Sequence, residues 1–157
     1  MIETKYSIDK IQHIYCLTNK GENEIWKLIP NYPYALSSYG RVINMNSGKF
    51  IKTFKDTTKD NDILCFGLNK SSSSCKRYLH LAIGMIFLDL KPNYKYELSF
   101  IDGDTTNYFY KNLQFKSVKK GKIISYETSI KNKKDSEELN TYLDYIISLH
   151  REEPLYI

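Results

Sequence analysis

The sequence has 157 residues, of which 41% are hydrophobic and 14% aromatic, and its formal net charge is +5 at pH 7. This length and composition exclude disorder over most of the chain, and they exclude a metal or disulfide that is required merely for folding. No run reaches the length of a membrane span and the N-terminal residues lack the apolar core of a signal peptide, so we expect an intracellular protein that contacts no membrane.

Residues 1–23 are predicted to form an N-terminal arm with a short helix. Ile8, Ile11 and Tyr15 lie near helical spacing, and Ser7 can serve as the N-cap. A polar run over residues 19–23 separates this arm from the next unit.

Residues 24–60 change to short strands and turns. The alternation of apolar and polar residues over 41–45 and 50–52 predicts a β-hairpin, with Asn46-Ser47-Gly48 as its turn. We therefore expect a small β module in this part of the chain.

Residues 61–121 are predicted to form a second unit. A strand over residues 63–70 is followed by a serine-rich connection at 71–74, and then by a strand that passes into an apolar helix ending near Leu88. The stretch from Glu97 to Phe115 reads as a strand, an Asp-Gly turn, a polar loop and a second strand. A strand-loop-strand unit of this kind can hold functional side chains in its loop, so we call residues 97–115 the site frame.

Residues 122–157 are predicted to be a basic linker followed by a C-terminal amphipathic helix. Asp135 can cap this helix with Glu138 three residues later. The helix, over residues 136–150, would carry one apolar stripe of Leu139, Tyr142, Leu143, Ile146 and Ile147. Packing of the stripe on the body is the first expectation, and a dimer or protein-partner interface is the alternative. Strands and helices together predict an α+β fold.

The three cysteines, Cys16, Cys65 and Cys75, are odd in number and form no Cys-x-x-Cys pair. The sequence therefore predicts neither a disulfide framework nor a zinc site. Free thiols are expected in a reducing compartment.

Charge is distributed unevenly along the chain. Residues 41–80 hold eight Lys and Arg against three Asp, and residues 116–135 hold seven Lys against two acids, whereas residues 136–157 hold one Arg against five acids. Two basic segments predict contact with a polyanion, because each neutralised phosphate releases counterions. Solvated lysine-rich loops are the alternative interpretation.

Two stretches of the chain resemble known modules. The first resembles the NUMOD4 module at the N-terminus of many phage and intron-encoded HNH homing endonucleases, and the second is similar to the HNH domain that follows it. The resemblance covers about residues 24–120 and rests on Glu24-Ile25-Trp26-Lys27-Leu28-Ile29-Pro30, Ser37-Ser38-Tyr39-Gly40-Arg41-Val42, Tyr78-Leu79-His80-Leu81-Ala82, Ile101-Asp102-Gly103, Asn107 and Asn112-Leu113.

This resemblance implies a small N-terminal β-hairpin (NUMOD4-like) module plus a ββα-metal (HNH-like) domain. It also implies DNA cleavage with a divalent metal such as magnesium, and an N-terminal module that helps to bind DNA. His80 matches the family's structural histidine before the first helix. The abundance of Lys, Asn, Ile and Tyr is typical of the AT-rich coding of many phages and large DNA viruses, so a virus or phage source is expected.

The reactive positions of the HNH frame are replaced in this sequence. The family usually has Asn or Asp and then His where this chain has Ser99 and Phe100. A neutral hydroxyl is a poor anchor for magnesium, and a phenyl ring cannot accept the proton that a general base removes from water. The resemblance places the last metal ligand of the family at Gly121. The frame residues Asp102, Gly103 and Asn112 are retained, and the resemblance implies that Asn112 braces the loop by hydrogen bonds.

We therefore expect a catalytically degenerate HNH-like protein that binds nucleic acid, DNA first, without cleaving it. No catalytic residue, metal ligand or cofactor is predicted. A magnesium ion is expected as a cofactor only if the nuclease interpretation is right. One alternative is a structural or protein-interaction protein recruited on the same fold, and another is an active magnesium-dependent endonuclease with non-standard residues. The predicted nucleic-acid contacts are Arg41, Lys49, Lys52, Lys70, Lys76, Arg77, Lys116, Lys119, Lys120 and Lys122.

Overall fold

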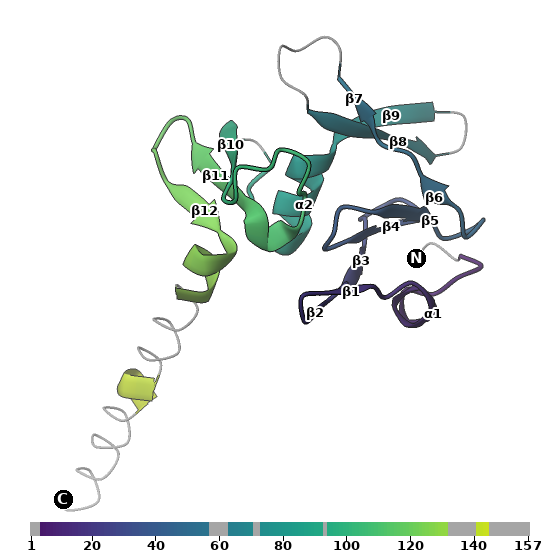
Figure 1. The fold of residues 1–157 in the computed structure, drawn as a ribbon, viewed down its shortest axis with the longest axis horizontal. Coiled ribbons are helices and arrows are strands. Elements are labelled where there is room, and N and C mark those ends of the chain that lie inside the picture. The colour runs from purple at the N-terminus through teal and green to yellow at the C-terminus, as the bar shows by residue number, and fades with distance from the viewer. Residues whose placement is uncertain (1–3, 57–62, 71–72, 93, 132–140, 145–157) are drawn as a thin grey trace, which may run out of the picture.

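The computed structural model describes residues 4–56, 63–70, 73–92, 94–131 and 141–144 (Figure 1). Within these ranges the fold is mixed α+β, with small antiparallel sheets and few helices, as the sequence predicts. Among the described residues, no helix combines the length and the apolar character that crossing a membrane requires.

The N-terminal part of the chain forms a four-stranded antiparallel sheet with a helix on one face. The sheet has the order β3-β4-β5-β6, and Gly48, at a φ of 73°, closes the predicted hairpin between β5 and β6. Ser7 Oγ accepts a hydrogen bond from Lys10 N–H, which confirms the predicted N-cap. The elements are α1 (Ile8–Ile14), β1 (Thr18–Asn19), β2 (Glu22–Asn23), β3 (Trp26–Leu28), β4 (Tyr34–Ser37), β5 (Val42–Asn44) and β6 (Phe50–Ile51).

Helix α1 belongs to the same packing unit as this sheet. Ile11 on α1 is fully buried against Trp26, Ala35, Ile43 and Met45. A division of the chain at residue 23, which the polar run 19–23 suggests, would cut through this core.

A second sheet and the central helix follow. The sheet has the order β7-β8-β9, and β9 leads directly into the apolar helix α2, as the sequence predicts. Ser73 and Ser74 pair with β8, so the connection between the two strands is shorter than the serine run. The elements are β7 (Phe54–Lys55), β8 (Leu64–Lys70), β9 (Ser73–Tyr78) and α2 (Leu79–Phe87).

The predicted site frame forms a third sheet, of order β10-β11-β12. Its elements are β10 (Tyr96–Phe100), the 3-10 helix η1 (Tyr110–Asn112), β11 (Leu113–Ser117) and β12 (Ile123–Ser125). The prediction of a linker from residue 122 is wrong at its start, because β12 is paired with β11 and residues 126–131 are helical. The physical reason is tertiary: Ile124 lies opposite the buried Phe115 and packs against the main core.

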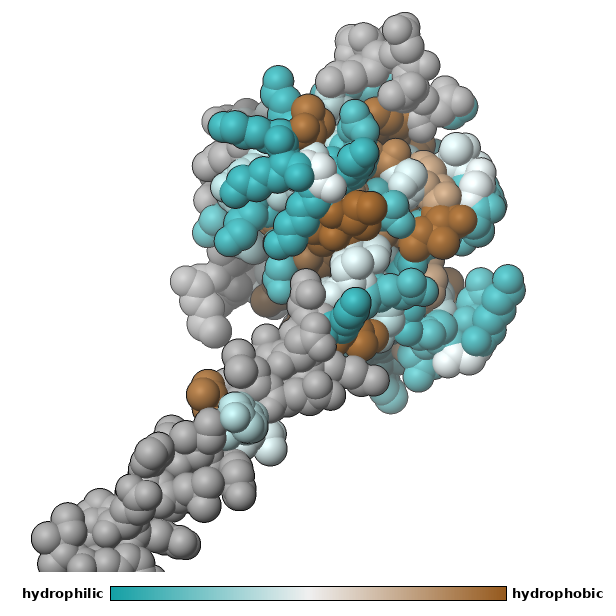
Figure 2. All heavy atoms as spheres, turned by 90° about the vertical axis from the view of Figure 1, so that its left-hand side faces the viewer, coloured by the Kyte–Doolittle hydropathy of each residue, from teal (hydrophilic) through white to brown (hydrophobic). Residues whose placement is uncertain are grey.

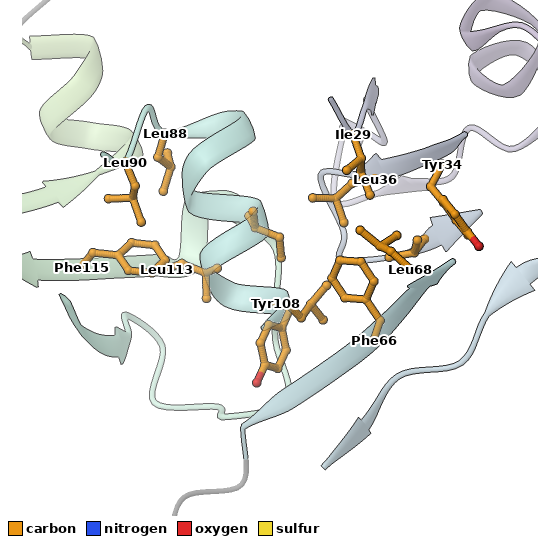
Figure 3. Close-up of a cluster of buried hydrophobic side chains, with 13 residues drawn as sticks. Ile29, Tyr34, Leu36, Phe66, Leu68, Leu88, Leu90, Tyr108, Leu113 and Phe115 are labelled. Carbon is orange, nitrogen blue, oxygen red and sulfur yellow. The ribbon is translucent and has the colours of Figure 1, made fainter. Parts of the chain in front are cut away.

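The main hydrophobic core joins the three sheets around α2 (Figure 3). Leu36 comes from β4, Phe66 and Leu68 from β8, and Leu113 and Phe115 from β11, and each is at most 1% exposed. Strand β4 is buried on both faces, because Ala35 faces the smaller core with α1 while Leu36 faces the main one. The NUMOD4-like and HNH-like parts therefore share one continuous interior.

Gly84 on α2 is a position where a methyl group would not fit. A Cβ there would lie 2.9 Å from Leu90 Cγ and 3.0 Å from Phe115 Cζ. We expect Gly84→Ala to lower the free energy of unfolding by about 1–2 kcal/mol, because overpacking outweighs the usual helix-propensity gain of about 1 kcal/mol. Urea denaturation measures the change.

Gly67→Ala on β8 is the matched control for that variant, since a Cβ at position 67 meets nothing within 4 Å. This control is expected to be neutral or slightly stabilising. An increase in stability for Gly84→Ala would contradict the packing described above.

The predicted C-terminal helix lies largely outside the described residues. Residues 141–144 are helical, and Tyr142 and Leu143 are 61% and 45% exposed. In Figure 1 this short segment stands apart from the sheets. The expectation that the apolar stripe packs on the body finds no support in these four residues.

Candidate functional site

The loop between β10 and β11 is held by a compact set of hydrogen bonds around Asp102. Asn112 Nδ2 donates to Asp102 Oδ1 (2.9 Å) and Asn112 Oδ1 accepts from Asp102 N–H (3.0 Å). Asn107 Nδ2 donates to Asp102 Oδ2 (2.8 Å), and Asp104 N–H donates to Asp102 Oδ1 (2.8 Å). Gly103 completes the turn at a φ of 76°, a conformation that favours glycine. Both carboxylate oxygens of Asp102 are thus committed to the loop itself.

These hydrogen bonds also set the charge state of Asp102. The side-chain amide of Asn107, then the N–H of Asp104 and then the side chain of Asn112 lower the pKa of the Asp102 carboxyl below its ordinary value of 3.8. Donors aimed at a carboxylate favour its charged form. Asp102 is therefore an ionised, bonded brace rather than a proton carrier at neutral pH.

Phe100 and Ser99 occupy the end of β10, where the family resemblance places the general base and a metal ligand. The Phe100 ring is half-buried and packs edge-on against Tyr108, with centroids 5.4 Å apart and planes at 78°. Ser99 is exposed on β10 opposite Gln114. Both positions are accounted for by packing and by strand pairing.

Gly121 lies in the turn between β11 and β12. Its φ is 66°, and its N–H donates to Ser117 O (2.8 Å). The next helical residues begin at 126. At the position expected for the last metal ligand, the chain therefore supplies a hairpin turn.

The two carboxylates of this loop are hydrogen-bonded within it. Magnesium is usually held by one or two carboxylates together with water and phosphate. Here Asp102 accepts from Asn107 and Asn112, Asp104 accepts from Thr106, and Ser99 offers only a hydroxyl. Across the described ranges, no three His, Cys, Asp or Glu side chains come close enough to hold a metal ion.

An open groove of about 810 Å³ runs beside β10. It is lined by consecutive residues of β10 together with Ile63, His80 and Tyr108. His80 is 7% exposed and stacks on Phe115, with ring centroids 6.2 Å apart. The retained histidine thus packs in the core at one wall of the groove.

Arg41, a predicted nucleic-acid contact, is held by the interior of the N-terminal sheet. Its guanidinium forms a bidentate ion pair with Glu24, which is fully buried, and donates to Tyr15 O (2.8 Å). The guanidinium carbon lies 5.4 Å from the Trp26 ring centroid and 4.6 Å from that of Phe50. Sequence reasoning missed this pair, although a glutamate and an arginine flanking an apolar β module were a signal for it.

The same stretch of the N-terminal sheet contacts the site loop directly. Tyr110 N–H donates to Ser38 O (3.0 Å), and the rings of Tyr39 and Phe109 meet edge-on at 5.1 Å. Lys111 Nζ lies 2.7 Å from Glu22 Oε1. The Ser-Ser-Tyr-Gly run is therefore a neighbour of the loop, a role that the sequence did not reveal.

The predicted nucleic-acid contacts do not gather at one place. Most of these residues belong either to the β11–β12 hairpin or to strands β8 and β9. In Figure 1, α2 lies between these two groups of strands. Figure 2 shows the side with the β11–β12 hairpin, where hydrophilic residues surround a smaller apolar group. The exposed members of the set are Lys49, Lys52, Lys76, Arg77, Lys116, Lys119, Lys120 and Lys122; the side chain of Lys70 is outside the described structure.

Among the exposed members of this set, Lys76 has a buried counter-charge. Its Nζ lies 3.3 Å from Asp56 Oδ2, and Tyr78 Oη donates to the same oxygen (2.9 Å). Asp56 is 5% exposed. Hydrogen bonding to Asp56 raises the pKa of Lys76 and that of Tyr78, so both groups remain protonated at neutral pH.

Comparison with protein families matches the NUMOD4 motif to residues 24–65. The comparison with curated proteins gives no match. A solved structure of the HNH homing endonuclease I-HmuI, described as showing DNA binding and cleavage, is similar over 71% of this chain and 59% of that one, with 20% identity and a TM-score of 0.49.

Proposed function

We propose, from the NUMOD4 motif that residues 24–65 carry, that this protein binds nucleic acid, with DNA as the first choice, and does not cleave it. The proposed absence of cleavage is supported by the residue at position 100. A phenyl ring half-buried against Tyr108 stands where the family resemblance places the general base.

The chemistry of phosphodiester hydrolysis supports the same conclusion. The reaction needs a group that takes a proton from water and a centre that stabilises the charge developing on phosphate. Phe100 offers no lone pair, Ser99 offers a neutral hydroxyl, and the Asp102 carboxylate is bonded into the loop. The loop keeps its shape without the groups that would react.

Exposed cations support the binding half of the proposal. The β11–β12 hairpin is the densest group, with Lys116, Lys119, Lys120 and Lys122 all exposed within seven residues. Lysines of this kind contact phosphate without reading sequence. The proposed binding is therefore strongly dependent on salt.

Fluorescence anisotropy with a random duplex oligonucleotide tests binding. We expect affinity to fall steeply between about 50 and 200 mM salt. The triple variant Lys119→Ala/Lys120→Ala/Lys122→Ala should reduce the slope of log K against log salt by up to about three. Lys91→Ala, which changes an exposed lysine outside the predicted set, is the matched control and should leave the slope unchanged.

A plasmid-nicking assay with magnesium or manganese tests the loss of cleavage. We expect no relaxed plasmid above the buffer control. Turnover that a single substitution in this chain abolishes would overturn the non-cleaving proposal and favour an active endonuclease with non-standard residues.

The second candidate function is a protein-interaction role. Tyr142 and Leu143, two members of the predicted apolar stripe, are exposed in the described segment 141–144 and favour it, because a contiguous exposed apolar patch marks a partner surface. Absence of any duplex binding at low salt would favour this role over nucleic-acid binding.

A further inference from the structure

Strand β10 has one edge that no strand of the described chain covers. In its sheet β10 pairs with β11 alone. The outer edge of β3 in the N-terminal sheet differs, because Trp26 N–H there donates to Gln12 Oε1 of α1 (2.7 Å). A side chain thus caps a backbone donor at that edge, and no such bond is seen along β10 within the ranges that the structure describes.

The direction of the open groups follows from the pairing of β10 with β11. Ile101 N–H, just after β10, donates to Asn112 O (2.9 Å). Hydrogen-bonding groups alternate between the two edges of an antiparallel strand, so Ile101 and every second residue before it face β11. The N–H and C=O groups of Tyr96 and Leu98 therefore point to the open edge.

The open edge borders the groove of about 810 Å³ described above. Ile63, His80 and Tyr108 also line this groove. Their side chains offer apolar and aromatic surface beside β10. An extended peptide laid along β10 would meet the open hydrogen-bonding groups together with this surface.

The charge of the groove favours a peptide over a nucleic acid. Glu97 is the charged side chain in its lining, and none of the lining residues is Lys or Arg. Lys116 lies opposite Glu97 on β11, one strand in from the open edge. Phosphate would be repelled at this rim, whereas a basic side chain would be attracted.

We propose that β10 accepts an added β-strand: an extended peptide with apolar side chains at alternate positions and basic side chains between them. Its main chain pairs with Tyr96 and Leu98, its apolar side chains enter the groove, and a basic side chain meets Glu97. This surface lies along the edge of β10 that faces away from β11, and the proposal goes beyond the nucleic-acid binding proposed above.

The test uses the full-length, nitrogen-15-labelled protein and a capped peptide of about seven residues that alternates lysine and valine, matched to a typical strand length. We expect the amide signals of Tyr96 and Leu98 to shift, and their hydrogen exchange to slow about ten-fold or more on binding. A peptide with alternate N-methylated amides should not bind. Glu97→Lys should weaken binding about five-fold, as expected for an exposed ion pair.

Glu127→Lys is the matched control, because Glu127 is exposed on the helical residues after β12 and does not line the groove. No shift along β10, or equal binding of the N-methylated peptide, would overturn the proposal. Perturbation of the same amides by a single-stranded oligonucleotide and not by the peptide would replace it with a nucleic-acid site. Protection that appears without peptide and rises with protein concentration would replace it with pairing between two copies of the chain.

Discussion

Arg41→Ala is expected to lower the free energy of unfolding by about 3 kcal/mol, because it leaves the buried carboxylate of Glu24 without its cation. Glu24 is 0% exposed, and Arg41 supplies both arms of its ion pair. The substitution also removes the contacts of the guanidinium with the rings of Trp26 and Phe50. Urea denaturation followed by the fluorescence of Trp26, the one tryptophan of the sequence, measures the loss.

Lys52→Ala is the control for this variant, since Lys52 is exposed near the same sheet and should change stability by less than about 0.5 kcal/mol. The double variant Glu24→Leu/Arg41→Met should recover much of the loss, because it removes the buried charge together with its partner. A loss below about 1 kcal/mol for Arg41→Ala would show that Glu24 does not depend on Arg41. Arg41 would then be available to contact phosphate, as the sequence suggested.

Asn112→Ala is expected to lower the free energy of unfolding by about 2–3 kcal/mol, because three hydrogen bonds of the site loop are lost at about 1 kcal/mol each. The amide of Asn112 donates to Asp102 Oδ1 and to Asn107 O, and its oxygen accepts from Asp102 N–H. Asn112 is 8% exposed, so water replaces these partners poorly. Chemical denaturation at neutral pH measures the cost.

The same variant should change how stability depends on pH. The lowered pKa of Asp102 contributes stability that is present above the ordinary value of 3.8 and is lost as pH falls through the lowered folded-state pKa. Asn112 is one of the groups that lower this pKa, so the variant should lose less stability than the wild type over that acidic window. Asn69→Ala, at an exposed position on β8, is the control. A variant with unchanged acid sensitivity would contradict the role of Asn112 at Asp102.

The residues of the NUMOD4-like stretch have structural roles around the Arg41–Glu24 ion pair and the loop braced by Asn112. Glu24, Trp26 and Arg41 belong to the stretch that resembles NUMOD4, and all three take part in the interior of the N-terminal sheet. Ser38 and Tyr39 from the same stretch contact the site loop. The motif therefore builds the body that supports the loop, and the exposed lysines elsewhere are the better candidates for phosphate contact.

Local patterns predicted the elements that depend on neighbouring residues. The cap at Ser7, the hairpin closed by Gly48 and the passage from β9 into α2 each follow from a short-range preference of the chain. Strand β12 was missed because its stability comes from pairing with β11 and from the packing of Ile124, both set by residues outside its own segment. The sequence alone presents Arg41 as a surface cation, because its partner Glu24 lies seventeen residues away in a different segment of the chain.

The sequence by itself determined the α+β class, the identity of Phe100 and Ser99 at the frame, and the excess of lysine in two segments. Side-chain chemistry is fixed by residue type, so the lack of a proton acceptor at position 100 needs no coordinates. Tertiary structure alone decided which charges are neutralised, which donors Asp102 receives, and which strand edge is left open. Those properties depend on distances between residues far apart in the chain, and folding sets these distances through the shared core around α2.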